Sequence, residues 1–139
     1  MTITRRATLG GIVASTALLA GCGQVTEAQP TEPASDVPTG EIKLGLTSEV
    51  MVGTGTKFAV NQMLTVLVTQ PKAGEFKAFS ATCTHAGCIV QGVEGSEIYC
   101  GCHGARFDYE SGMVTAGPAK SALGKIPLEI RGEEIWVIL

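Results

Sequence analysis

Cysteines and histidines, the side chains best suited to holding metals, gather in two short segments of this chain. The first segment reads Cys83-Thr84-His85-Ala86-Gly87-Cys88, and the second reads Cys100-Gly101-Cys102-His103-Gly104. Together they contain four of the five cysteines and both histidines of the whole sequence. Each segment supplies a Cys and a His close together plus a second Cys, and its glycines allow the backbone to turn closely around a bound group.

Three kinds of site compete for these six side chains. Two disulfides would use the four cysteines of an exported protein but would give the two histidines no role. A zinc site could use two Cys and two His, yet it would leave two cysteines over, and the spacing is not that of a zinc finger or ribbon. A Rieske-type iron–sulfur cluster takes two Cys on one iron and two His on the other, so it uses both histidines and one Cys from each segment, and it is the reading that we favour.

The pattern Cys-Thr-His-x-Gly-Cys followed by Cys-x-Cys-His-Gly resembles the double-loop signature of Rieske proteins of the cytochrome bc type, and the likeness covers about 41–139. The resemblance implies one 2Fe–2S cluster, with the Cys ligands on one iron and the His ligands on the other. The implied ligands are Cys83, His85, Cys100 and His103. It also implies a disulfide between Cys88 and Cys102, which the oxygenase-type ferredoxins of this family usually lack.

The residues around the implied cluster depart from the family's pattern in two places. The third loop of the family, Gly-Pro-Ala-Pro, matches at Gly117 and Pro118 and departs at Lys120. High-potential members usually carry Ser and Tyr, which donate hydroxyl hydrogen bonds to sulfur, where this chain has Ala105 and Phe107. Without these donors the extra negative charge of a reduced cluster is stabilised less, so we predict a reduction potential below that of Ser/Tyr members.

From residue 41 onward the chain predicts an all-β fold in which antiparallel, Rieske-like sheets carry the cluster-binding loops. Short segments rich in β-branched and aromatic residues alternate with turn residues, and no stretch of twelve residues has convincing helical spacing. The predicted strands are 57–60, 63–69, 76–80, 89–93, 97–100, 106–109, 112–115, 125–130 and 135–139. The two ligand segments fall on loops between these strands.

Residues 1–21 resemble an export signal rather than part of the fold. Arg5 and Arg6 precede an apolar run of about fourteen residues, which is too short to span a bilayer comfortably. The Thr-Arg-Arg stretch resembles a twin-arginine signal, with a general secretion signal as the alternative. The run ends in Leu-Ala-Gly-Cys, which resembles the bacterial lipobox and implies that Cys22 is lipidated after cleavage. The alternative is an uncleaved anchor or an ordinary signal with an incidental Cys22.

Residues 22–40 are predicted to be the lipidated Cys and a flexible tether. The segment 23–40 holds three of the six prolines and only two large apolar residues, so it cannot bury enough surface to order itself. We therefore expect three parts: a signal peptide at 1–21, the lipidated Cys and tether at 22–40, and a Rieske domain at 41–139. Attachment through Cys22 would place the protein on the outer face of the bacterial cell membrane, or at the periplasmic membrane surface.

Charge and motif content limit the class of function. Without Arg5 and Arg6, eight Lys and Arg face 13 Asp and Glu, and this acidic balance argues against nucleic acid as a partner. No constellation indicates a catalytic nucleophile or general base of its own. The expected function is one-electron transfer with redox partners such as a cytochrome b or c, with a quinol as a further candidate. The protein would be a freestanding carrier or the Rieske subunit of a quinol-oxidising complex; the alternatives are an electron donor to an oxygenase and a non-redox zinc module.

Overall fold

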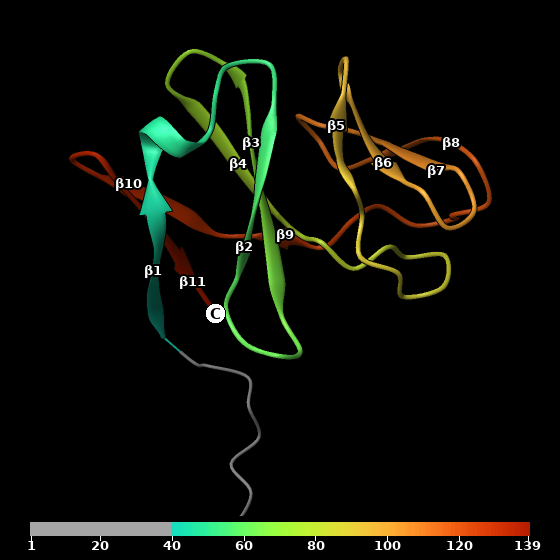
Figure 1. The fold of residues 1–139 in the computed structure, drawn as a ribbon, viewed down its shortest axis with the longest axis horizontal. Coiled ribbons are helices and arrows are strands. Elements are labelled where there is room, and N and C mark those ends of the chain that lie inside the picture. The colour runs from blue at the N-terminus through green and yellow to red at the C-terminus, as the bar shows by residue number, and fades with distance from the viewer. Residues whose placement is uncertain (1–39) are drawn as a thin grey trace, which may run out of the picture. The chain divides into compact units, whose positions relative to one another are not determined.

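The computed structural model describes residues 40–139, which form three antiparallel sheets and a single turn of 3-10 helix, η1 (Thr47–Glu49) (Figure 1). The predicted all-β class is thus confirmed. The predicted signal peptide, Cys22 and the tether up to residue 39 lie outside the described residues. Within the described part of the chain, no helix combines the length and the apolar character needed to cross a membrane.

Two of the sheets share one core. The first sheet has the order β1 (Glu41–Leu46), β11 (Glu134–Ile138) and β10 (Leu128–Arg131). The second has the order β2 (Gly55–Ala59), β3 (Thr65–Lys72), β4 (Glu75–Ser80) and β9 (Lys125–Ile126). Both contribute to one group of buried side chains: Val50, Val66, Val68, Ala78, Ile135 and Val137. These two sheets form the base of the domain.

The third sheet is a meander that carries the second ligand segment. Its strands follow chain order, β5 (Gly92–Glu94), β6 (Glu97–Cys100), β7 (Ala105–Asp108) and β8 (Val114–Ala116), and they lie to the right in Figure 1. A second buried group joins this meander to the base: Leu67, Phe79, Ala81, Cys83, Val90, Ile98, Cys100, Ala105, Phe107, Ala119 and Leu123. The two buried cysteines are therefore part of the core.

Strand β3 lies between the two cores. Its side chains alternate, so that Val66 and Val68 face the base core while Leu67 faces the core of the meander, and all three have no exposed surface. Because a strand buried on both faces has little freedom to tilt or slip, β3 fixes the position of one core relative to the other.

Several strands differ from the sequence prediction. The predicted strand 89–93 is β5 at Gly92–Glu94, and the predicted strand 112–115 is β8 at Val114–Ala116. Strand β1 and its pairing with β11 were not predicted, although Ile42, Leu44 and Leu46 alternate along the segment; the partner strand lies about 90 residues away. Strand β3 continues through Pro71 to Lys72, with a register shift after Thr69 that accommodates a residue without an N–H. The predicted strand 125–130 is divided at Pro127 into β9 and β10, which belong to different sheets.

Candidate metal centre

The two ligand segments adopt the same local turn. The N–H of Gly87 donates to the carbonyl of Cys83 at 2.9 Å, and the N–H of Gly104 donates to the carbonyl of Cys100 at 3.0 Å. Both glycines have positive φ angles, 77° and 75°, which residues with a side chain rarely adopt. Glycine four residues after the first Cys thus closes each loop, and this explains the spacing that the two segments share.

A disulfide joins the two loops. Cys88 and Cys102 are bonded, with their Cα atoms 6.6 Å apart. Among the described residues the remaining cysteines, Cys83 and Cys100, carry free thiols. The pairing implied by the family resemblance is therefore confirmed, and it leaves one free Cys and one His on each loop.

The four remaining side chains meet as two pairs. Cys83 and Cys100 are 2% and 1% exposed, and their thiols interact with each other. His85 and His103 are exposed, with Nδ1 of one ring 3.2 Å from Nδ1 of the other and the ring planes 82° apart. The sulfur pair thus lies in the core and the imidazole pair at the surface.

This donor arrangement fits a dinuclear cluster. In a Rieske cluster each iron takes only two protein ligands, two Cys on one and two His on the other. Two nitrogen ligands of a tetrahedral first-row metal, with bonds of about 2.1 Å, lie roughly 3.4 Å apart, close to the observed separation. Within residues 40–139, no three or more His, Cys, Asp or Glu side chains gather as ligands of a single ion. Two separate pairs are what a two-iron cluster requires of the chain.

The surroundings of Cys83 combine burial with backbone donors. Burial raises the pKa of the Cys83 thiol, and hydrogen bonding to the backbone of His85 opposes this shift while the thiol of Cys100 adds to it. A hydrogen bond from the Ala86 backbone also lowers this pKa. N–H groups aimed at the sulfur favour its charged form, which is the form that binds a metal.

A third loop closes against the other two at Gly117 and Pro118. Gly117 has a φ of 85°, and a Cβ placed there would lie only 2.6 Å from the carbonyl oxygen of Gly104. On the other side, the hydroxyl of Thr84 donates to the carbonyl of Ser121 at 2.6 Å. The three loops are therefore held pairwise, by a disulfide, a side-chain hydrogen bond and a close backbone approach.

Ala105 and Phe107 occupy the two positions at which high-potential members usually carry Ser and Tyr. Both are fully buried on β7, in the same core group as Cys83 and Cys100. A hydroxyl at either position would enter the core group that contains the two thiols. In this chain neither of the two side chains carries a hydroxyl group.

Some contacts of the site could not be read from the sequence. Lys57 on β2 donates to the carbonyl of Val90 at 3.0 Å and so ties the base to the end of the first loop. The bond between Thr84 and Ser121 joins residues 37 apart. Neither contact has a local sequence signal, because each depends on how distant strands are placed.

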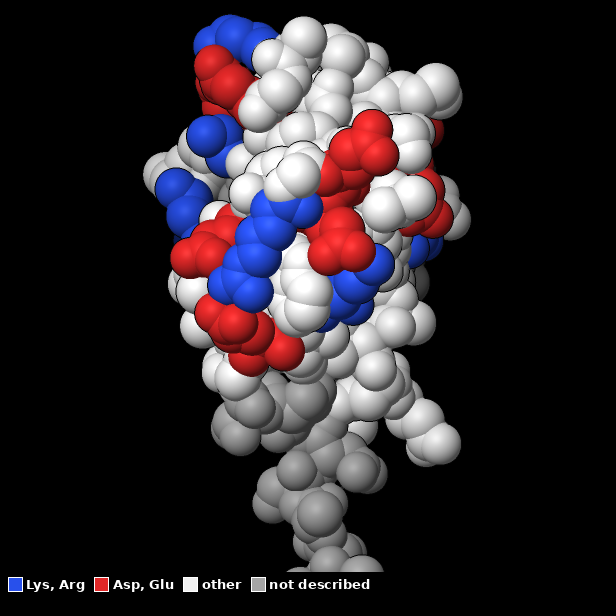
Figure 2. Space-filling model, turned by 90° about the vertical axis from the view of Figure 1, so that its left-hand side faces the viewer, with Lys and Arg blue, Asp and Glu red and all other residues white. Residues whose placement is uncertain are grey.

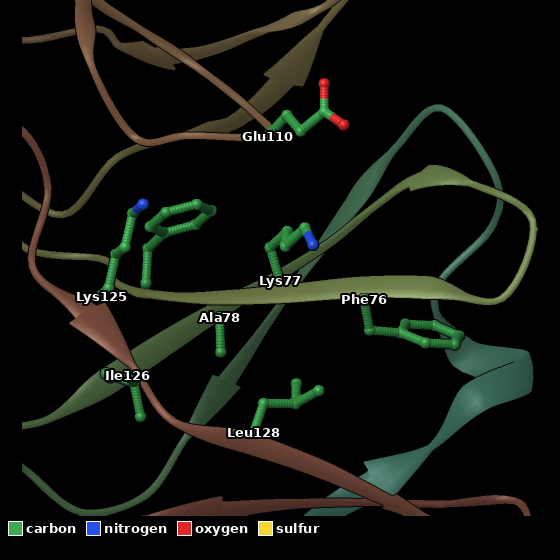
Figure 3. A pocket seen from close by; sticks show the side chains of 8 residues that line it. Phe76, Lys77, Ala78, Glu110, Lys125, Ile126 and Leu128 are labelled. Carbon is green, nitrogen blue, oxygen red and sulfur yellow. The ribbon is translucent and has the colours of Figure 1, made fainter.

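A separate cavity of about 260 Å³ lies away from the three loops. It is lined from β4, β9, β10 and the turn after β7, and Figure 3 shows Lys77, Lys125 and Glu110 on one side and Ile126 and Leu128 on the other. None of its lining residues is one of the cysteines or histidines. The candidate metal centre is therefore not this cavity but the surface formed by the loops.

Comparison with known proteins agrees with the geometry. Residues 32–127 match the family described as the Rieske [2Fe-2S] domain. The cytochrome b6-f complex iron-sulfur subunit of Chlorobaculum thiosulfatiphilum is 34% identical over 98 residues, which cover 70% of this chain and 52% of that subunit. The chain thus spans about half the length of the curated relatives that head the comparison.

Two solved structures show the same architecture. The cyanobacterial plasma membrane Rieske protein PetC3 from Synechocystis PCC 6803 has a TM-score of 0.58 and 28% identity, covering 70% of this chain and 99% of that one. A structure of the reduced oxygenase and oxidised ferredoxin of carbazole 1,9a-dioxygenase contains a chain with a TM-score of 0.63 and 24% identity, covering 73% of this chain and 94% of that one. The second likeness concerns the fold alone.

Proposed function

Because this chain belongs to the Rieske 2Fe–2S domain family and so carries one Rieske-type cluster, we propose that it transfers single electrons at a membrane surface. In this proposal the buried thiol pair binds one iron and the exposed imidazole pair binds the other. The proposed ligands are Cys83, Cys100, His85 and His103. The observation that carries the assignment is the 3.2 Å approach of the two Nδ1 atoms above a buried pair of free thiols.

The bound cluster supplies the chemistry, since it accepts and returns one electron. The chain controls access and charge. Backbone hydrogen bonds at Cys83 favour the thiolate, and the core around Cys100 excludes water from the sulfur side. The exposed rings of His85 and His103 are the side from which a partner can approach.

Two forms of the function remain, and the N-terminal sequence bears on them. The similarity to a cytochrome b6-f complex subunit supports a role within a quinol-oxidising complex. The lipobox-like sequence ending at Cys22 supports a freestanding carrier, held at the outer face of the membrane by lipid. We favour the freestanding carrier, because a lipid anchor with a tether makes a spanning helix unnecessary.

Quinol oxidation discriminates the two forms. A membrane cytochrome b partner would be assayed for quinol oxidation with and without the full-length protein. A subunit of the complex should restore a missing activity, whereas a freestanding carrier should leave quinol oxidation unchanged and should exchange electrons with soluble cytochromes. Full dependence of quinol oxidation on this protein would contradict the freestanding form.

The location has its own test. Changing Cys22 to Ser removes the thiol that would be lipidated and leaves the Rieske domain untouched. We expect the variant to move from the membrane to the soluble fraction while keeping its iron and acid-labile sulfide. Retention of the variant in the membrane fraction would contradict attachment through Cys22.

A ferredoxin-like donor to an oxygenase is the second candidate, because an oxygenase ferredoxin complex shares the fold. The bond between Cys88 and Cys102 favours the cytochrome bc type, in which this disulfide is usual. Reductive cleavage of the bond between Cys88 and Cys102 discriminates between the cytochrome bc type and the ferredoxin type. A cluster that is lost after reduction belongs to the disulfide-dependent type, and a cluster that is unaffected would favour the ferredoxin type.

A further inference from the structure

The three loops at the proposed cluster carry one fixed charge. Residues 81–91, 100–105 and 116–124 contain no Asp, Glu or Arg and a single Lys, Lys120. The domain is otherwise slightly acidic, with ten Asp and Glu against eight Lys and Arg in 41–139. A lone positive charge on a neutral surface of an acidic domain is a local feature that a partner can recognise.

Lys120 lies beside an exposed ligand residue. It lines an open hollow together with Thr84, His85, Pro118 and Ser121. The main chain is held on both sides of it, since Ala119 is only 6% exposed in the core and the carbonyl of Ser121 accepts the hydrogen bond from Thr84. The backbone at position 120 is thus fixed next to the imidazole edge, while the ammonium group is exposed.

Most other cations of the domain have a partner, since Lys43, Lys72, Arg106 and Arg131 form ion pairs and Lys57 donates to a carbonyl. Within the described part of the chain, Lys77 and Lys125 are in no ion pair, and both line the separate cavity of Figure 3. Arg106, at the start of β7, pairs with Glu94 and Glu97 at 3.3 Å each and stacks over the ring of Tyr99. On the face of the β1–β11–β10 sheet, Figure 2 shows basic side chains interleaved with acidic ones. Among the ion pairs of residues 40–139, none includes Lys120.

We propose that Lys120 is the recognition residue of this electron carrier, pairing with a surface carboxylate of an acidic redox partner that docks on the hollow beside His85. The inference rests on the proposed function. A carboxylate placed there would neutralise the one free charge of the surface and would bring the partner against the exposed imidazole edge. A partner with a basic docking surface would meet an uncompensated positive charge at the same point.

The test uses one haem protein in two charge forms. Full-length reduced protein is mixed in a stopped-flow instrument with ferric cytochrome c, whose surface is basic, or with the same cytochrome after succinylation, which makes its lysines acidic. One electron leaves the reduced protein and converts ferric haem to ferrous haem. At low ionic strength we expect Lys120→Gln to slow reduction of the succinylated form about threefold and to speed reduction of the native form. Both effects should vanish near 1 M salt.

Two variants control for net charge and for the side chain itself. Lys125→Gln removes the same charge from an exposed residue that lines the separate cavity of Figure 3, so it should leave the ratio of the two rates nearly unchanged. Lys120→Arg keeps the charge and should keep both rates. A change in reduction potential would move both rates in the same direction, whereas loss of recognition moves them in opposite directions.

The outcomes separate the inference from the function on which it rests. Opposite shifts for Lys120→Gln, absent in Lys125→Gln, support Lys120 as the recognition residue. Equal behaviour of the two Gln variants, or a shift of both rates in one direction, overturns it while the carrier function stands. If the unaltered protein reduces neither form of cytochrome c, the proposed carrier function fails, and the inference fails with it.

Discussion

Replacing Phe107 by Tyr should raise the reduction potential of the cluster. Phe107 is fully buried on β7 and packs in one core group with the thiols of Cys83 and Cys100. In the Ser/Tyr members that the sequence resembles, a hydroxyl at this position donates to a ligand sulfur, and we expect the same of a tyrosine here. A hydrogen bond to sulfur stabilises the reduced state more than the oxidised state, because reduction adds a negative charge.

The size of the shift follows from the hydrogen-bond energy. A hydrogen bond to a charged group contributes roughly 1.5–3 kcal/mol, and the bond is present in both oxidation states, so only part of it acts on the potential. If the difference between the states is about 1–2 kcal/mol, the one-electron potential rises by roughly 40–85 mV, since about 59 mV corresponds to a tenfold change in equilibrium constant. Ala105→Ser should act in the same direction.

A redox titration followed by absorbance or circular dichroism measures the shift. Phe58→Tyr is the matched control, because Phe58 packs against the other core and should leave the potential unchanged. Thermal unfolding is recorded on the same samples, since a buried hydroxyl without an acceptor would cost about 1–3 kcal/mol of stability. A folded Phe107→Tyr protein whose potential is unchanged or lower would refute the reasoning.

Three further changes test the contacts between the loops and the turn that follows β7. Gly117→Ala should destabilise the domain by at least about 2 kcal/mol in chemical unfolding, because the new Cβ would clash and the φ angle is positive. Gly95→Ala, at a positive φ but in open space, should cost only about 1 kcal/mol. Equal costs for the two variants would contradict the clash. Cys102→Ser opens a disulfide whose partners are 14 residues apart and should lower the free energy of unfolding by about 3 kcal/mol, and an unchanged denaturation midpoint would be the contrary result. Hydrogen bonds from Ser111 lower the pKa of Asp108, so this carboxylate stabilises the fold above its unfolded pKa, and the contribution is lost as the pH falls through the lower folded value. Asp108→Asn should therefore be roughly 0.5–1 kcal/mol less stable than the unaltered protein at pH 7, with the gap closing in acid; a gap that is constant with pH would show that charge plays no part.

The sequence was most informative at the two loops. The ligand set and the disulfide between Cys88 and Cys102 were implied by the resemblance of these loops to the Rieske signature, and that signature is local in the chain. The all-β class also followed, because alternation in segments such as 97–100 and 106–109 is a local property. For the same reason the turn between β5 and β6 was placed within a residue of its position in the structure.

What the sequence did not reveal depends on distant partners. The pairing of β1 with β11 joins the two ends of the domain, and the sheet change at Pro127 depends on where β4 offers an edge to β9. The contact from Lys57 to the first loop joins residues 33 apart, and the ion pairs of Arg106 depend on the register of the strands β5, β6 and β7. The position of Lys120 beside His85 became visible only in the structure.

The most direct test of the central claim is pulsed EPR of the dithionite-reduced, full-length protein with and without 15N-labelled histidine. The account predicts a reduced 2Fe–2S signal with a low average g-value and two nitrogen couplings that both change on labelling, from His85 and His103 bound to one iron. A spectrum that does not respond to the label, or a protein that holds zinc in place of iron and sulfide, would contradict it.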